Sequence, residues 1–440
     1  MMSRYFGPVC LSMVLTLCLL ILSCGDSGTS PEGGGPGTGE TSYVVLAWND
    51  LGMHCLNPTY DELVILPPYN TVWAQVVERG NPPKIVTTGI TVEYALENNT
   101  YSVGKRDYGQ FWDSAVDLFG PMFGISDLPA NTGLTGKGLS GTMDLNGDHF
   151  VADGLPVVPV DDEDVWDPYQ IALITVKDAK GKVLISTRAT VPTSDEINCG
   201  KCHGQEPFAH ILEEHDEEHS TNLTDSKPVL CAGCHGSPAL GQLEPGSSGI
   251  FLSKAIHGSH SDRGAACYDC HPGTVTECNR STRHASRDGN CVTCHGSMAT
   301  VAGQIPLQRT PWVDEPGCAN CHSDVDGVVT WGLLYRDAKG HGEVYCAACH
   351  GSPHAMVPSD LAVDNYQAMQ YQGFSDKAKS LGSCGVCHNS SRGDEDDIEE
   401  FAEKHGGSIP ERTTACNVCH TSVVNNTSKW PHSYEWSNSN

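Results

Sequence analysis

The chain has 440 residues, of which 39% are hydrophobic, so it is long enough to form more than one domain. It carries 54 acidic and 26 basic side chains, which gives a formal net charge of −28 at pH 7. Such a charge repels nucleic-acid phosphates and anionic membrane surfaces, so no nucleic-acid partner is expected. The chain also has 21 cysteines and 20 histidines, and most of them lie in its second half.

The N-terminus predicts export from the cytoplasm. Arg4 precedes an apolar run from Val9 to Leu22, which is too short to span a membrane as a mature helix. The run ends in the letters ILSC, which resemble a bacterial lipobox with Cys24 as the acylated residue. Residues 1–23 are therefore interpreted as a lipoprotein signal peptide, with an ordinary signal peptide or an uncleaved anchor as alternatives. Gly25 replaces the aspartate that retains lipoproteins at the inner membrane, which favours the outer membrane or the cell surface.

The next two segments predict a tether and a β domain. Residues 24–42 are rich in glycine, serine and proline, which is typical of a flexible linker. Residues 43–194 predict strands at YVVLAW, LVILPPY, TVWAQVV, IVTTGITVEYAL, TMDL, HFVA, YQIALITV and VLISTRATV. Asn146-Gly147 and residues 179–182 predict hairpins, so we expect an all-β, immunoglobulin-like sandwich with His149 at its surface.

Residues 195–440 contain eight copies of Cys-x-x-Cys-His, a motif that attaches haem covalently in exported proteins. The two thiols bond to one edge of the porphyrin, and the adjacent histidine binds the iron. Zinc sites and disulfides also use paired cysteines, but neither needs a histidine after every second cysteine. The expected haem-bonding cysteines are Cys199, Cys202, Cys231, Cys234, Cys267, Cys270, Cys291, Cys294, Cys318, Cys321, Cys346, Cys349, Cys384, Cys387, Cys416 and Cys419. The expected proximal iron ligands are His203, His235, His271, His295, His322, His350, His388 and His420.

Eight c-type haems also determine the expected architecture of residues 195–440. So few residues are available for each haem that separate hydrophobic cores cannot enclose them. We therefore expect the porphyrins themselves to form the core, wrapped by short helices and loops with little regular structure.

The remaining histidines are candidates for the opposite, distal face of each iron. The haem region has only three methionines, Met298, Met356 and Met369, so bis-histidine ligation and low reduction potentials are expected. The favoured distal ligands have helical spacing or lie near a motif: His215, His219, His257, His260, His284, His341, His354 and His405. His54, His210 and His432 are reserve distal ligands.

Two cysteines are left without an assigned role. Cys10 and Cys18 belong to the signal peptide, which leaves Cys55 and Cys278 outside the haem motifs. In an oxidising compartment these two predict a disulfide between the β domain and the haem domain. Two buried free thiols are the alternative.

The chain resembles multihaem outer-surface c-type cytochromes of metal-reducing and related anaerobic bacteria. The resemblance is carried by the segments AACHGSPHAMVPSD, CGVCHNSSRG and VPTSDEINCGKCH, and it extends to NDLGMHC and WDPYQ in the β domain. It implies bis-histidine haems in a chain of alternating stacked and perpendicular contacts, used for extracellular electron transfer. Some members of this group polymerise into filaments, in which a histidine of one subunit ligates a haem of the next, and His54 or another reserve histidine is the candidate for that role in this chain.

The sequence therefore predicts an electron-transfer protein rather than an enzyme. Its expected partners are other redox cytochromes and extracellular electron acceptors or minerals, with a lipid anchor in the membrane and a homo-polymer as a further option. One alternative is a multihaem reductase of a small nitrogen or sulfur compound, which requires one haem with an open coordination site. Another is a β domain that serves mainly as a docking module.

Overall fold

The computed structural model describes residues 42–80, 82–273, 275–282, 284, 291–305, 309–318, 333–372, 381 and 384–388. The expected signal peptide, with Cys24, and almost all of the linker lie outside this part of the chain. Several expected haem residues also lie outside it: Cys321, His322, His405, Cys416, Cys419, His420 and His432. For His341 and Cys384 only the backbone is described.

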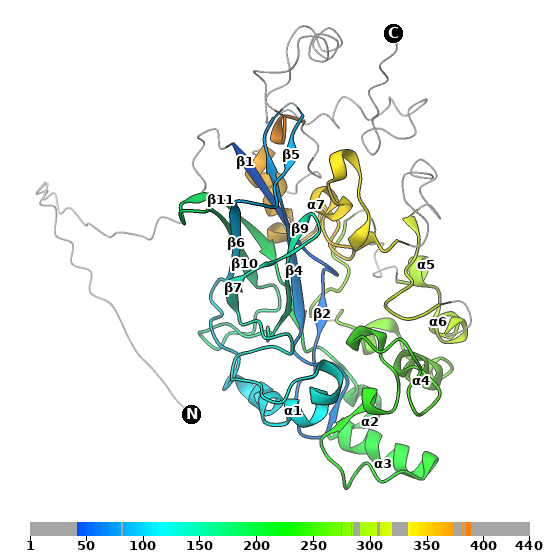
Figure 1. The fold of residues 1–440 in the computed structure, drawn as a ribbon. Helices are drawn as coiled ribbons and strands as arrows, with labels where there is room; N and C mark the ends of the chain where they lie inside the picture. Colours follow the sequence, from blue (N-terminus) through cyan, green and yellow to red (C-terminus); the bar gives the residue numbers. More distant parts are fainter. Residues whose placement is uncertain are drawn as a thin grey trace, which may run out of the picture. The chain divides into compact units, whose positions relative to one another are not determined.

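The N-terminal region forms two antiparallel sheets (Figure 1). The first has the order β1-β4-β9-β8, with β5 paired to β4, and consists of β1 (Tyr43–Asn49), β4 (Asn70–Glu78), β5 (Lys84–Ile85), β8 (Asp144–Asn146) and β9 (His149–Leu155). The second has the order β11-β10-β6-β7 and consists of β6 (Ile90–Leu96), β7 (Ser140–Thr142), β10 (Ile171–Asp178) and β11 (Val183–Thr190). Burial alternates along β10, where Ala172, Ile174 and Val176 are fully buried, because successive side chains point to opposite faces. The predicted β region is confirmed.

Both predicted hairpins are present. Gly147, at a φ of 63°, turns β8 into β9, and Gly181, at a φ of 80°, turns β10 into β11. The expectation for His149 was wrong, because this residue is only 4% exposed. Its ring stacks on Trp73 at a centroid distance of 4.3 Å, and its Nδ1 lies 3.0 Å from the hydroxyl of Tyr345.

The β region also contains a helix that the strand pattern did not predict. Helix α1 (Gly109–Phe123) buries Phe111, Ala115 and Phe119. These three residues are spaced by four, which is the period of one helix face and the signal that could have revealed it. The helix ends at Gly124, whose φ of 68° fits a glycine cap.

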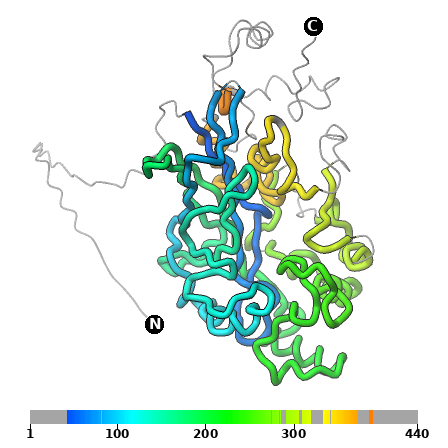
Figure 2. Tube along the Cα trace, in the orientation of Figure 1, coloured from blue at the N-terminus to red at the C-terminus, as the bar shows by residue number. Residues whose placement is uncertain are grey.

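The second half of the chain is built from short helices and turns (Figure 2). The helices are α2 (Gly200–His203), α3 (Pro207–His219), α4 (Leu252–His260), α5 (Cys291–His295), α6 (Met298–Gln304), α7 (Cys346–His350) and α8 (Tyr366–Gln372). The 3-10 turns of this half are η2 (Cys231–Gly233), η3 (Pro238–Leu240), η4 (Cys267–Asp269), η7 (Tyr335–Asp337), η8 (His341–Glu343), η9 (Ala362–Asn365) and η10 (Cys384–Val386), whereas η1 (Arg106–Tyr108) lies in the β region directly before α1. None of the helices in the described ranges is long and apolar enough to cross a bilayer.

Two small parallel sheets add contacts within and between the two halves. Strand β2 (His54–Cys55) pairs with β12 (Thr193–Ser194) inside the β region. Strand β3 (Leu63–Val64) pairs with β13 (Val229–Leu230), which belongs to the second half of the chain.

The two halves share their hydrophobic cores. The core between the two large sheets also contains Tyr345, Tyr371 and Val386 from the second half. The core around α1 contains Leu230 and Leu240 in the same way. The sequence boundary near residue 194 is therefore not a boundary between separately packed cores.

Helix α8 covers the edge of the first sheet. Strand β1 ends the order of this sheet, so one side of its backbone has no strand partner. The Tyr371 hydroxyl accepts from Val45 N–H at 3.1 Å and donates to Val45 O at 2.7 Å. Gln367 bonds the N–H and the carbonyl of Ala47. These side chains satisfy an edge that would otherwise be open to pairing with another strand.

Candidate haem centre

Each motif whose backbone is described begins a helical turn. The first and last residues of three motifs close that turn: His203 N–H donates to Cys199 O at 2.9 Å, and His271 N–H donates to Cys267 O at 2.8 Å. The corresponding bond from His235 is 3.0 Å long. Residues at positions i, i+3 and i+4 share one face of a helical turn. The local fold therefore places both thiols and the imidazole of a motif on the same side.

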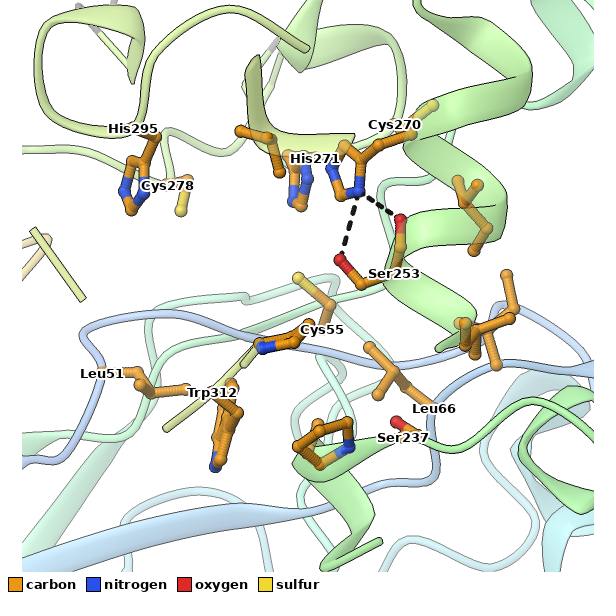
Figure 3. A pocket seen from close by; sticks show the side chains of 18 of the residues that line it. Leu51, Cys55, Leu66, Ser237, Ser253, Cys270, His271, Cys278, His295 and Trp312 are labelled. Carbon is orange, nitrogen blue, oxygen red and sulfur yellow. Dashed lines mark hydrogen bonds between the residues drawn. The ribbon is translucent and has the colours of Figure 1, made fainter. Parts of the chain in front are cut away.

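The motif side chains line one large cavity of about 2820 Å³. Its wall includes both cysteines and the histidine of each of the first four motifs, together with Cys318, Cys346 and His350. The β region contributes Met53, Tyr69 and Trp73 to the same wall. In Figure 3, His271, His295 and Cys278 lie on one side of this space, and Leu51, Cys55 and Leu66 lie on the other.

Four motif histidines each lie beside one non-motif histidine, and the distance between the two ring centroids is nearly the same in all four pairs. The centroid distances are 6.2 Å for His203 and His260, 6.3 Å for His235 and His215, 6.1 Å for His271 and His257, and 6.2 Å for His295 and His354. Of the eight favoured distal histidines, the structure thus places His215, His257, His260 and His354 opposite a motif histidine.

Hydrogen bonds fix the protonation of three of these non-motif rings. The Nδ1–H groups of His257 and His260 donate to Ser253 O and Ile256 O, each at 2.7 Å, within helix α4. The Nδ1–H of His354 donates to Leu51 O at 3.0 Å. In each case Nε2 keeps its lone pair, which is the form that binds a metal ion.

Burial keeps the cavity groups neutral. It lowers the pKa of His271 and of His295 to about 4, with neighbouring histidines adding to the effect. Burial also raises the pKa of the Cys231 thiol to about 12. Neutral imidazoles can ligate iron, and a neutral sulfur matches the environment of a thioether bond.

Thiols of different motifs affect one another's pKa. Cys291 is hydrogen-bonded to Cys267, which links the third and fourth motifs. Burial raises the pKa of Cys199 to about 11, and Cys270 of the third motif adds to this rise. Burial likewise raises the pKa of Cys318, and Cys294 of the fourth motif contributes.

Thiols of later motifs affect one another's pKa in the same way. Burial raises the pKa of Cys346 to about 11, with a contribution from Cys318. Burial raises the pKa of Cys349 to about 12, with a contribution from Cys387 of the seventh motif. Neither Cys349 nor Cys387 is among the residues that line the large cavity. The seventh motif lies beside the β region instead, where His388 bridges to Gly80.

The other candidate histidines have different surroundings. His54 is buried, and its Nε2 bonds to Asp50 at 2.7 Å. His210 has its Nδ1 3.1 Å from Nδ1 of His203, where Glu214 completes a group of possible metal ligands. The ring centroid of His219 lies 4.8 Å from that of His215, with the rings tilted by 60°, and the His219 side chain is 62% exposed. His284 lies 3.5 Å from the hydroxyl of Ser281.

Cys55 and Cys278 both line the cavity. Both are free thiols in the structure. Burial raises the pKa of Cys55, and the neighbouring Cys278 adds to the rise.

We predict that these two thiols form a disulfide when the protein is exported. Iodoacetamide treatment of the denatured, unreduced protein is then expected to label neither residue 55 nor residue 278, whereas prior reduction exposes both to labelling. The haem-bonded cysteines resist labelling in either case, because their sulfurs are alkylated by the porphyrin. Labelling of Cys55 without reduction, read by peptide mass spectrometry, contradicts the prediction.

The described residues fit c-type haem. Protein interiors rarely contain voids larger than a water molecule, and sites for one small molecule reach roughly 1,000 Å³, so this cavity has room for several large groups. Arg309 also lines the cavity, and its buried Nε has no hydrogen-bond partner within the described ranges. A guanidinium in this position suits a haem propionate. The sequence did not single out Arg309, because nothing about a lone arginine marks it before its neighbours are known.

A cavity walled by thiols and imidazoles from consecutive Cys-x-x-Cys-His turns defines a multihaem c-type cytochrome. A family model described as cytochrome c3 matches residues 259–351, which include the third to sixth motifs. The match supports a multihaem electron-transfer cytochrome that binds c-type haem and iron. None of the curated proteins compared with the chain matches it.

Proposed function

We propose that this protein is an octahaem cytochrome that conducts electrons along a row of bis-histidine haems at the outer cell surface. The sites are numbered here in the order of their motifs, so that site 1 contains His203 and site 8 contains His420. The observation that carries the proposal is the set of four matched imidazole pairs across the cavity.

The spacing within these pairs fits two axial ligands of one iron. An imidazole nitrogen binds a metal ion at about 2 Å, so rings on opposite faces of one ion have centroids about 6 Å apart. All four pairs have this separation, and each joins one motif histidine to one non-motif histidine. When bound, each haem supplies a one-electron couple, and two histidine ligands set it at a low potential.

The positions of the ligands and thiols also support a route. Helix α4 carries both His260, the partner of site 1, and His257, the partner of site 3, which makes these sites neighbours. Helix α3 carries His215, the partner of site 2, and His210, which contacts His203 of site 1.

The hydrogen bond between Cys291 and Cys267 then links site 3 to site 4, and the electrostatic effects between thiols support a continuation through sites 5, 6 and 7. The proposed route is therefore 2-1-3-4-5-6-7, in which only the first two sites exchange their sequence order. Site 2 is placed at one end of this route, because α3 connects it to site 1. Since electron tunnelling weakens steeply with distance, such closely spaced sites favour conduction along this path.

The proposed location rests on the export signal that the sequence predicts. We propose that Cys24 is acylated and anchors the protein at the outer membrane, with residues 24–42 as a spacer. Proposed partners are other redox cytochromes and extracellular acceptors or minerals, and a homo-polymer is a further proposed state. A Cys24→Ser variant is expected to leave the membrane fraction and to retain its haems. Continued membrane association of that variant, followed by fractionation and haem staining, contradicts the lipid anchor.

The haem count and the spin state test the central proposal. We expect eight haems per chain by pyridine haemochrome assay and intact mass, and only low-spin ferric signals by electron paramagnetic resonance. Two nitrogen ligands on every iron give this result because the ligand field is strong on both faces. One stoichiometric high-spin haem instead indicates an open coordination site and supports a reductase of a small nitrogen or sulfur compound.

A further inference from the structure

We infer that the N-terminal β region positions the distal iron ligand of site 4, through a loop that holds the ring of His354. The loop comprises residues 49–53 and is called here the 49–53 loop. The inference rests on the proposed function, since it requires His354 to be the axial partner of His295.

The hydrogen bond that orients His354 comes from outside its own segment. Leu51 O accepts from the Nδ1–H of His354 at 3.0 Å and from its backbone N–H at 3.2 Å. The rings of His257 and His260 obtain the same kind of bond from their own helix, four residues earlier. His354 lies in a turn after α7 and has no such carbonyl, so a residue 303 positions away in the sequence supplies it.

The 49–53 loop is held rigidly enough to serve this purpose. Asn49 is 1% exposed, and its Oδ1 accepts from the N–H groups of Leu51 at 3.2 Å and Gly52 at 2.6 Å. Its Nδ2 donates to Asn70 Oδ1 and to Thr71 O, each at 2.7 Å. A buried polar group with all its bonds satisfied fixes one conformation, because any other leaves a polar atom unpaired.

Gly52 brings the loop into direct contact with the ligand segment. A Cβ atom at this position would lie 3.1 Å from Ser352 Cβ, 3.2 Å from Ala355 N and 3.3 Å from His354 N. The absence of a side chain therefore lets the Leu51 carbonyl approach His354. The glycine also has a φ of +87°, which L-residues adopt only at a cost.

Gly52→Ala tests this role, with Gly104→Ala as the matched control. Gly104 has a φ of +90°, but a Cβ there meets nothing within 4 Å, so the control has the same backbone cost without the contact. In the Gly52→Ala holoprotein, one of the eight ferric haems is expected to change its low-spin g values or become high-spin. Its midpoint potential is expected to shift as well. Gly104→Ala is expected to give wild-type spectra and potentials, and indistinguishable spectra from both variants overturn the inference.

Two further variants separate the possible failures. His354→Ala is expected to make one haem high-spin; if all haems stay low-spin, the proposed ligand pair itself is wrong. If His354→Ala makes one haem high-spin while Gly52→Ala has no effect, only the role of the loop is overturned. If Gly52→Ala lowers the total haem content, Gly52→Ala/Ser352→Gly decides, because it removes the nearest clashing atom. Recovery of eight low-spin haems supports the contact, and no recovery overturns it.

Discussion

Replacement of His215 by alanine is expected to convert one of the eight haems from low-spin to high-spin. The ring of His215 lies 6.3 Å from that of His235, the distance of two axial ligands. In the proposed bis-histidine arrangement, the loss of His215 leaves one face of the site 2 iron to water, a weaker ligand, and raises the reduction potential of that haem. Electron paramagnetic resonance and a spectroelectrochemical titration of the purified holoprotein measure the two effects.

His219→Ala is the matched control, because it removes an imidazole from the same helix one turn away. The side chain of His219 is 62% exposed, and its ring lies beside that of His215 at a tilt of 60°. This variant is expected to keep all haems low-spin. The opposite result, with His219→Ala high-spin and His215→Ala unchanged, shows that His219 is the ligand of site 2.

Replacement of Arg280 by methionine is expected to lower the free energy of unfolding by about 3–5 kcal/mol. Both Arg280 and Asp364 have side chains only 2% exposed, and they form bonds of 2.8 Å and 3.1 Å. Asp364 also accepts from Ser359 and from Thr190 of β11, and the bond from Thr190 ties this ion pair to the β region. Methionine fills the volume but leaves a buried carboxylate without its counter-charge. Guanidinium unfolding followed by far-ultraviolet circular dichroism measures the loss.

Two comparisons make the Arg280 prediction specific. Arg280→Met/Asp364→Leu removes both charges and is expected to cost less than Arg280→Met alone, because no buried charge is left unpaired. Arg188 pairs with Glu97 at 2.7 Å, but these side chains are 38% and 32% exposed. Arg188→Met is therefore expected to cost no more than about 1 kcal/mol. Equal losses of unfolding free energy for Arg188→Met and Arg280→Met contradict the prediction that the buried Arg280–Asp364 ion pair stabilises the fold.

The residues of the β region illustrate why some features were predictable. Hairpins at residues 147 and 181 follow from local turn chemistry, since glycine readily takes the positive φ that such turns need. Helix α1 is the opposite case. Its helical pattern, formed by Phe111, Ala115 and Phe119, was missed because the sequence on both sides of it predicts strands. His149 was misplaced because its burial depends on Tyr345, which is 196 residues away.

The sequence by itself determined the chemistry of the haem attachment. Thiol and imidazole must lie on one helical turn to reach one porphyrin, so the Cys-x-x-Cys-His spacing is a local requirement and can be read directly. The pairing of ligands is not local. His354 faces His295, and Leu51 of the β region orients it, through contacts between segments far apart in the chain. Only the tertiary structure shows which rings lie about 6 Å apart, because the two histidines of each pair come from different segments and the fold brings them together.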